Sequence, residues 1–223
     1  MITVHHLENS RSQRVLWLLE ELGLPYEVQR YARDPKTSLA PPELAQVHPL
    51  GKSPVISEGR QVVAETGAIV EYLVDKADGA LRPPPGSAAQ RRWTYWLHFA
   101  EGSAMPPLVM ALVFDRVKTA PMPFFARPIA KAIADNVMKS FVGPTLMRQF
   151  QFIEAELAAR RWFAGDAFSA ADVMMSFPLE GAAARHLIDA KRHPQSMQWL
   201  ERIHARPAYQ RALERGGPYR LLD

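Results

Sequence analysis

Three consecutive prolines at positions 83–85 separate two parts of the chain that differ in sequence pattern. They belong to the stretch 77–87, which also holds two glycines and can continue neither a helix nor a sheet. Before this stretch, apolar residues alternate in some segments and recur with helical spacing in others, whereas after Ser87 only helical spacing occurs. We therefore predict a first domain at residues 1–78, a linker at 79–87 and a second domain at residues 88–223.

The first domain begins with the pattern of a strand, a helix and a second strand. Residues 2–7 alternate as a strand does, and residues 12–22 carry one apolar stripe at helical spacing, which Gly23 and Pro25 end. Residues 26–31 are typical of a second strand. Because a short helix lies between the two strands, we expect them to be parallel, with a right-handed crossover.

A hairpin and another helix complete the first domain. After an irregular proline-rich stretch, segments 54–57 and 61–64 predict two short strands joined by a tight turn. Thr66 is predicted to cap the helix that follows. The order βαβ and then ββα predicts an α/β domain, and the part beyond Ser87 predicts an all-helical bundle. Pro106-Pro107 and Gly143-Pro144 should kink or break two long helices of that bundle.

The composition excludes several kinds of protein. The chain has no cysteine, which removes disulfides, thiolate metal sites and any cysteine nucleophile. Its 27 Lys and Arg against 23 Asp and Glu give a charge of +4, but the basic residues form no dense run, so nucleic-acid binding is not predicted. The sequence shows no secretory signal pattern and no apolar run of the roughly 20 residues that span a membrane. We predict a cytoplasmic protein without a metal.

Three segments carry the chemistry of an anion-binding site. Residues 9–14 start a helix, where free backbone N–H groups and the helix dipole favour an anion. Residues 48–55 contain Pro54 at the first position of a strand, and a cis bond before it would turn the backbone of Val55 outward to meet a peptide-like ligand. Glu65 and Thr66 start a further helix and suit an α-amino, α-carboxylate head group.

Together these segments resemble the cytosolic glutathione transferases, and the resemblance covers essentially the whole chain. Residues 7–25 resemble the first strand and helix of the family, residues 49–56 its cis-proline strand, and Glu65-Thr66 its Glu-Ser pair. Residues 168–172, Phe-Ser-Ala-Ala-Asp, resemble the capping motif of its helical domain, in which Ser169 caps a helix and Asp172 reaches back to the Ser169 N–H. The resemblance implies a thioredoxin-like first domain that holds glutathione as co-substrate and a helical domain that shapes the second substrate's pocket.

The resemblance also implies roles for individual residues. Ser10 would donate its hydroxyl to the glutathione sulfur, because it precedes Arg14 by four positions as the catalytic serine does in the serine-type classes; Ser12 and then Asn9 are the alternatives. Its further implications concern the ligands of glutathione. They are Lys52 for the glycyl carboxylate, Val55 after Pro54 for the cysteinyl backbone, Glu65 and Thr66 for the γ-glutamyl group, and Glu101 for the glutathione amine of a partner subunit in a homodimer.

The predicted function is conjugation of the glutathione thiolate to a small hydrophobic electrophile, or reduction of a hydroperoxide, as in detoxification. No general base is assigned to His5, His6 or His48. The absence of cysteine excludes a thioredoxin-like redox protein or a cysteine-dependent reductase, whereas a non-catalytic member that binds glutathione or a protein remains the alternative. Candidates for the electrophile's pocket lie on the first long helix after the linker: Met105, Leu108, Met110, Leu112 and Phe114.

Overall fold

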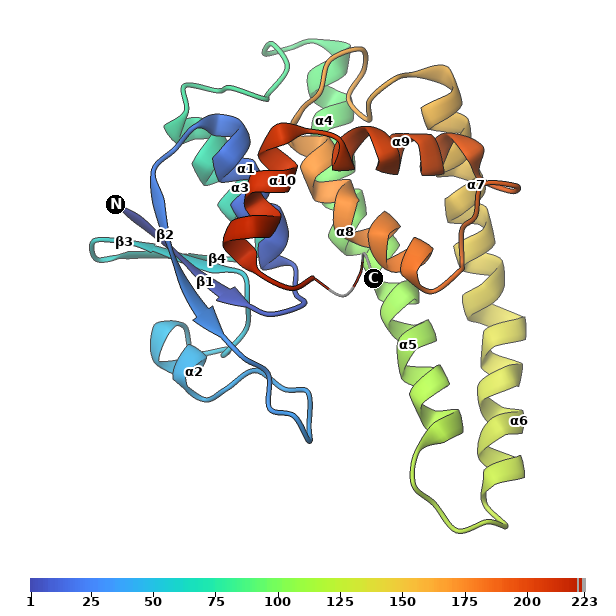
Figure 1. The fold of residues 1–223 in the computed structure, drawn as a ribbon. Helices are drawn as coiled ribbons and strands as arrows, with labels where there is room; N and C mark the ends of the chain where they lie inside the picture. The colour runs from blue at the N-terminus through green and yellow to red at the C-terminus, as the bar shows by residue number, and fades with distance from the viewer. Residues whose placement is uncertain (220, 222–223) are drawn as a thin grey trace.

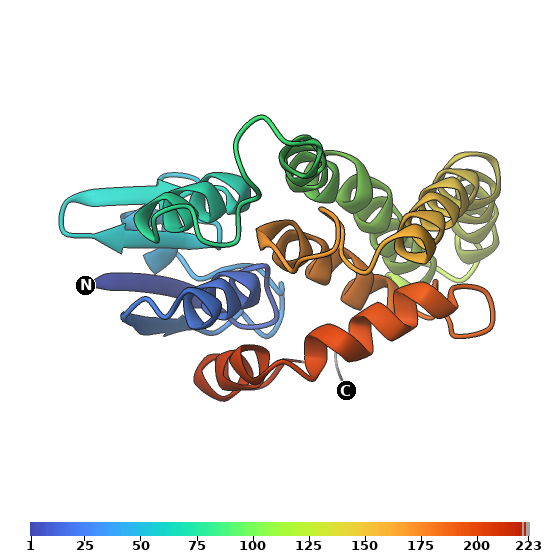
Figure 2. The same cartoon turned by 90° about the horizontal axis from the view of Figure 1, so that it is seen from above.

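The computed structural model describes residues 1–219 and 221 and consists of two domains side by side (Figures 1 and 2). The first contains a four-stranded sheet of order β2-β1-β3-β4. Strand β1 pairs parallel with β2, as predicted, and β3 pairs antiparallel with β4 in the predicted hairpin. The antiparallel pairing of β1 with β3 joins these two units into one sheet. Its elements are β1 (Ile2–Leu7), α1 (Ser12–Leu22), β2 (Tyr26–Tyr31), α2 (Glu43–Val47), β3 (Val55–Glu58), β4 (Gln61–Ala64) and α3 (Thr66–Lys76).

The helices and strands predicted for this domain agree closely with those of the structure, with two corrections. Helix α2 lies in the stretch expected to be irregular, where Pro42 stands at its N-cap position. Thr66 does not cap α3: it is the first residue of that helix, and Glu65 holds the cap position without a side-chain hydrogen bond to the helix. The end of α1 is as predicted, since Gly23 adopts a left-handed conformation with φ 64° at the C-cap.

The second domain is helical throughout its named elements, as predicted. Its capping motif is confirmed, because Asp172 Oδ2 accepts the Ser169 N–H at 3.0 Å, and Oδ1 accepts the Phe163 N–H at 3.0 Å and the Trp199 indole N–H at 3.2 Å. The elements are α4 (Ala88–Phe99), α5 (Met105–Thr119), α6 (Arg127–Val137), α7 (Gly143–Ala159), α8 (Ala170–Ala184), α9 (Pro194–His204) and α10 (Pro207–Gly216).

Both proline sites of the bundle lie next to π-helical turns rather than at breaks. The turn η1 (Ala100–Ala104) joins α4 to α5, and η2 (Met138–Val142) joins α6 to α7. A proline has no N–H to donate to the preceding turn, and a wider turn accommodates this loss. The Gln149 side chain donates to the carbonyl of Ser103 at 2.8 Å, just before Pro106-Pro107. Gly143 is required in the second turn, because a Cβ there would lie 2.7 Å from the Met138 carbonyl oxygen.

The long helical stretch Ala88–Thr119 is apolar enough to cross a membrane by length and composition alone, which sequence analysis did not anticipate. In this fold it passes through the bundle, with Trp96, Ala104 and Leu108 buried in the core. The stretch is therefore accounted for as a partly buried core helix. Beyond the core, α5 and α6 form a hairpin that extends away from the rest of the molecule (Figure 1).

The last helix returns to the first domain. Helix α10 lies along α1 (Figure 2), where the Tyr209 ring meets the Trp17 ring edge-on at a centroid distance of 5.1 Å. Arg211 and Arg215 pair with Glu20 of α1 at 2.7 and 3.4 Å. The first domain thus buries α1 between its own sheet and a helix contributed by the end of the chain.

Candidate active site

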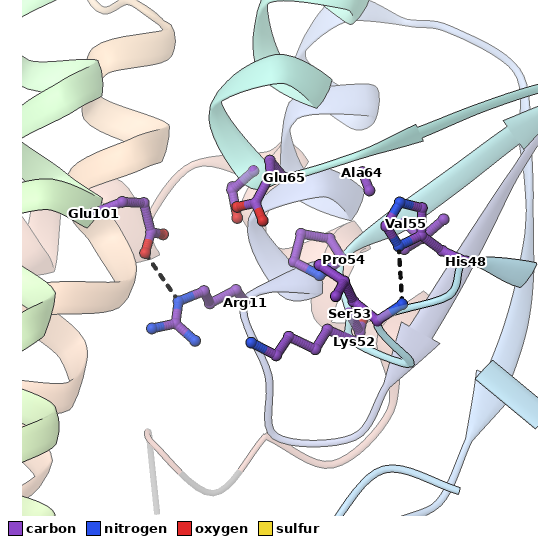
Figure 3. A pocket seen from close by; sticks show the side chains of 11 residues that line it. Arg11, His48, Lys52, Ser53, Pro54, Val55, Ala64, Glu65 and Glu101 are labelled. Carbon is purple, nitrogen blue, oxygen red and sulfur yellow. Dashed lines mark hydrogen bonds and ion pairs between the residues drawn. The ribbon is translucent and has the colours of Figure 1, made fainter. Parts of the chain in front are cut away.

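A pocket of about 220 Å³ opens between the two domains (Figure 3). Most of its wall comes from the loop before β3, the start of β3 and the start of α3, and the helical domain contributes Glu101 from η1. The Ser53-Pro54 peptide bond is cis, as the sequence suggested. The lining residues are Arg11, His48, Leu50, Lys52, Ser53, Pro54, Val55, Ala64, Glu65, Thr66 and Glu101.

Six of the seven residues predicted to bind or transform glutathione line this pocket; Ser10 does not. The predicted candidates for the electrophile's wall are also absent from its lining, and Met105 and Leu108 lie in the hydrophobic core. Their burial follows from the helix, whose apolar face packs inside the bundle. The six that do line the pocket are Lys52, Pro54, Val55, Glu65, Thr66 and Glu101.

The start of α3 presents Glu65 to the pocket in a constrained backbone conformation. Glu65 has φ 71° and ψ 127°, a region that residues with a Cβ rarely adopt and that costs about 1–3 kcal/mol. Its carboxylate points toward the space between the domains (Figure 3), and Glu65 is exposed while Thr66 beside it is buried. This geometry places an acidic group and a hydroxyl at the N-terminus of a helix, as the predicted head-group site requires.

A buried arginine ties the two domains together behind the pocket. The Arg14 side chain is fully buried, donates to the Met174 carbonyl at 2.7 Å and to the Thr66 hydroxyl at 3.4 Å, and forms an ion pair with Glu101 Oε1. Because a charge in the interior is costly without partners, these acceptors from α3, η1 and α8 fix α1 against both domains.

Glu101 therefore lies between two guanidinium groups of its own chain. Its other oxygen, Oε2, accepts from Arg11 Nε at 3.1 Å. Burial alone would raise the pKa of the Glu101 carboxyl, but the charges of Arg14 and Arg11 hold that pKa below its ordinary value. Its reach toward a partner subunit stays a prediction.

Ser10 is buried beside the pocket in a small polar network. Its Oγ accepts the Ser12 N–H at 3.2 Å and lies 2.8 Å from Ser12 Oγ. Ser12 is in turn hydrogen-bonded to His6 Nδ1 at 2.9 Å. Neither serine is the N-cap of α1, because Arg11 holds that position without a side-chain cap. The network places the Ser10 hydroxyl at the start of α1, next to the Ser12 hydroxyl, which is itself hydrogen-bonded to His6.

His6, to which no general-base role was assigned from the sequence, is hydrogen-bonded to Ser12. It is almost completely buried, and burial, assisted by the nearby Arg30 charge, lowers the pKa of His6 to about 4. The imidazole is therefore neutral at physiological pH and serves as a fixed hydrogen-bonding group. Its position in β1, one residue before Leu7, gave no sequence signal of contact with Ser12.

Arg11 is the principal site residue that sequence reasoning missed. Arg11 and Arg14 are three positions apart at the start of α1, a spacing that puts two side chains on one face of a helix. That spacing could have predicted that Arg11 lies beside Arg14. It could not have predicted their common partner Glu101, which lies about 90 residues away in sequence.

A four-stranded sheet of thioredoxin-like order with a cis-proline before β3, joined to a helical bundle across a charged cleft, defines the class of two-domain protein to which this chain belongs. Residues 10–76 match the family "Glutathione S-transferase, N-terminal domain", and residues 125–207 match "Glutathione S-transferase, C-terminal domain". The chain belongs to the glutathione S-transferase family.

Individual relatives support this assignment along nearly the full chain. Glutathione S-transferase 3 of Schizosaccharomyces pombe and glutathione S-transferase 1 of Saccharomyces cerevisiae are each 34% identical over 96% of this chain, covering 88% and 95% of the respective relative. A crystal structure of a glutathione S-transferase from Actinobacillus pleuropneumoniae is 33% identical with a TM-score of 0.75, over 97% of this chain and 93% of that one. The predicted family, fold and transferase function are confirmed.

We expect the neutral state of His6 to appear as a pH dependence of stability. The folded chain protonates His6 only near pH 4, whereas the unfolded chain does so near pH 6.5, so acid favours unfolding within this window. Relative to a His6→Gln variant, the wild-type free energy of unfolding should fall by about 3 kcal/mol as the pH drops from 7 to 4. Denaturant unfolding of both proteins at several pH values measures this difference; a constant difference would show that His6 does not titrate with folding.

Proposed function

We propose that the interdomain pocket binds glutathione and that the chain transfers its thiolate to a small hydrophobic electrophile or uses it to reduce a hydroperoxide. The observation that carries this proposal is the convergence of Lys52, Glu65 and Thr66 around the cis-proline start of β3. In support, a family member from Pseudomonas fluorescens, 26% identical with a TM-score of 0.75 over 96% of this chain and 92% of that one, was solved with two glutathione molecules bound.

The charges of the pocket match those of glutathione. The Lys52 ammonium suits the glycyl carboxylate, and the Glu65 carboxylate suits the γ-glutamyl ammonium, while the Thr66 hydroxyl and the N-terminus of α3 suit its carboxylate. Val55 begins β3 at the pocket wall, directly after the cis Ser53-Pro54 bond, and we assign it the contact with the cysteinyl residue. Each end of the tripeptide thereby meets a group of opposite charge.

The chemical step that needs assistance is ionisation of the thiol. A free thiol with a pKa near ~8.5 is mostly protonated at neutral pH, and only the thiolate is a strong nucleophile. The N-terminus of α1 favours the negative charge, and we assign the hydrogen bond to the sulfur to Ser10. Ser10 Oγ already accepts the Ser12 N–H, so the Ser10 hydroxyl proton is the group left to donate, either to Ser12 Oγ or to a thiolate.

We place this reaction in the cytoplasm. The identity of the second substrate decides whether the enzyme conjugates glutathione or reduces hydroperoxides. Turnover of a panel of haloaromatic compounds and hydroperoxides with glutathione measures whether conjugation or peroxide reduction dominates. No turnover of any of them, with glutathione bound, would favour the non-catalytic alternative.

Replacement of Lys52 tests the binding mode. Lys52→Ala removes a charge-assisted hydrogen bond, so the dissociation constant for glutathione should rise about 10-fold to 100-fold. Lys131→Ala removes an exposed lysine of α6 and is the matched control, with unchanged affinity. Titration calorimetry measures both; equal affinities in the two variants would contradict the assignment.

Replacement of the two serines tests the source of thiol activation. Ser10→Ala should raise the pKa of the bound thiol and lower turnover by about one to two orders of magnitude, while glutathione affinity is retained. Ser12→Ala should change the pKa much less. Thiolate absorbance titrated against pH is the measurement. A shift in Ser12→Ala alone would move the role to Ser12, and a shift in neither would leave activation to the helix N-terminus.

We also propose that the chain is a homodimer, as the family resemblance implies, with Glu101 near the partner's glutathione. Light scattering at micromolar concentration should give a mass near twice the 25.1 kDa of one chain. A monomer would refute the dimer and confine Glu101 to the pocket of its own chain.

A further inference from the structure

Arg11 reaches into the cleft from the start of α1 and has no role in glutathione binding as proposed above. Its side chain is 34% exposed, and Nε donates to Glu101 Oε2 at 3.1 Å. The guanidinium lies between Glu101 and the Lys52 ammonium, facing the open part of the pocket (Figure 3). Its two terminal nitrogens, Nη1 and Nη2, have no hydrogen-bond partner within residues 1–219 and 221.

The ion cluster that contains Arg11 carries a surplus positive charge. Arg14, Arg11 and Glu101 together hold two guanidinium groups and one carboxylate, a net charge of +1. Glu101 must neutralise Arg14 first, because the Arg14 side chain is fully buried whereas Arg11 keeps contact with solvent. The surplus charge is therefore presented to the pocket through Arg11.

The aromatic ring of Phe177 packs against the guanidinium groups of both Arg11 and Arg14. The guanidinium carbons of Arg11 and Arg14 lie 5.5 and 5.3 Å from the centroid of Phe177, a residue of α8. The aromatic face restricts the guanidinium of Arg11 and limits its access to water on that side. A guanidinium held in this way, whose two terminal nitrogens bond to none of the residues that the structure describes, has the geometry that binds a carboxylate through two parallel hydrogen bonds.

If glutathione binds as in the proposed function, on which this step rests, both of its carboxylates are taken by other residues, and an anion that meets Arg11 belongs to another molecule. The glycyl carboxylate is assigned to Lys52 and the γ-glutamyl carboxylate to Thr66 and the start of α3, on other parts of the wall. Arg11 and Lys52 are the arginine and lysine among the pocket-lining residues that the structure describes, and of these two only Lys52 is assigned a carboxylate of glutathione.

We propose that Arg11 recognises a negatively charged group on the second substrate, so that the enzyme prefers electrophiles that carry a carboxylate or a similar anion. Glu101 and Phe177 act as positioning residues for its guanidinium. The substrate class is then an apolar electrophile with an acidic substituent, rather than a wholly neutral one.

A pair of matched electrophiles tests this proposal. 4-Chloro-3,5-dinitrobenzoate and its methyl ester react by the same step, in which the thiolate sulfur forms a bond to the ring carbon and chloride leaves with the electron pair of the C–Cl bond. The quantity to compare is the ratio of kcat/KM for the acid to kcat/KM for the ester. This ratio cancels any change in glutathione binding or thiol activation.

Arg11→Gln should lower the acid-to-ester ratio about 10-fold to 100-fold, the loss expected for a charge-assisted hydrogen bond. Arg11→Lys should lower the acid-to-ester ratio less than Arg11→Gln does, because lysine keeps the positive charge but cannot form two parallel hydrogen bonds to a carboxylate. Arg127→Gln removes one exposed positive charge from α6, outside the pocket, and should leave the ratio at its wild-type value. Added salt should lower the wild-type ratio.

An unchanged ratio in Arg11→Gln would overturn the proposal, and an unchanged ratio with a raised thiol pKa would assign the guanidinium to the sulfur instead. Failure of glutathione binding in wild type would refute the proposed function separately. In that event, calorimetry of the acid and the ester without glutathione still tests the role of Arg11, because Arg11→Gln should raise the dissociation constant of the acid and leave that of the ester unchanged. An equal change in both dissociation constants, or no change in either, would refute the role of Arg11.

Discussion

The buried guanidinium of Arg14 sets the geometry on which the rest of the site depends. Water cannot solvate this charge, so the chain must supply acceptors from wherever they are available, and they come from three separate elements: Glu101 of η1, Met174 of α8 and Thr66 of α3. The requirement fixes the start of α1 relative to the start of α3 and to the helical domain. The same contacts thereby hold the two helix N-termini and the acidic residue of the second domain around one pocket.

The wide turn that carries Glu101 shows how proline contributes to this arrangement. Pro106 and Pro107 prevent regular α-helical hydrogen bonding in the turn before them, and η1 occupies that place. A π-helical turn inserts an extra residue per turn and so shifts the direction of the side chains around it. The carboxylate that neutralises Arg14 thus lies in a local irregularity of an otherwise continuous helix of 32 residues.

The sequence predicted features that depend on local pattern and missed those that depend on contacts between distant segments. Alternation, helical spacing and Gly23 were sufficient for the βαβ unit, and the motif of Ser169 and Asp172 was sufficient for its capping contact. The cap of α3 was misassigned because Thr66 has the right chemistry one position too late, and its hydroxyl accepts from Arg14 instead. The pairing of Arg11 with Glu101 had no local signal, since only the packed domains bring these residues together.

The return of α10 to the first domain has a consequence for how the chain is made. The face of α1 that carries Trp17 is covered by Tyr209, yet the ribosome completes α10 about 140 residues after the end of α3. At roughly 5–20 residues per second, the nascent first domain exposes that aromatic face for many seconds before its cover exists. Until α10 is made, the Trp17 indole therefore lacks the Tyr209 ring that meets it in the finished fold, and this part of the interface between the domains forms only after the last helix leaves the ribosome.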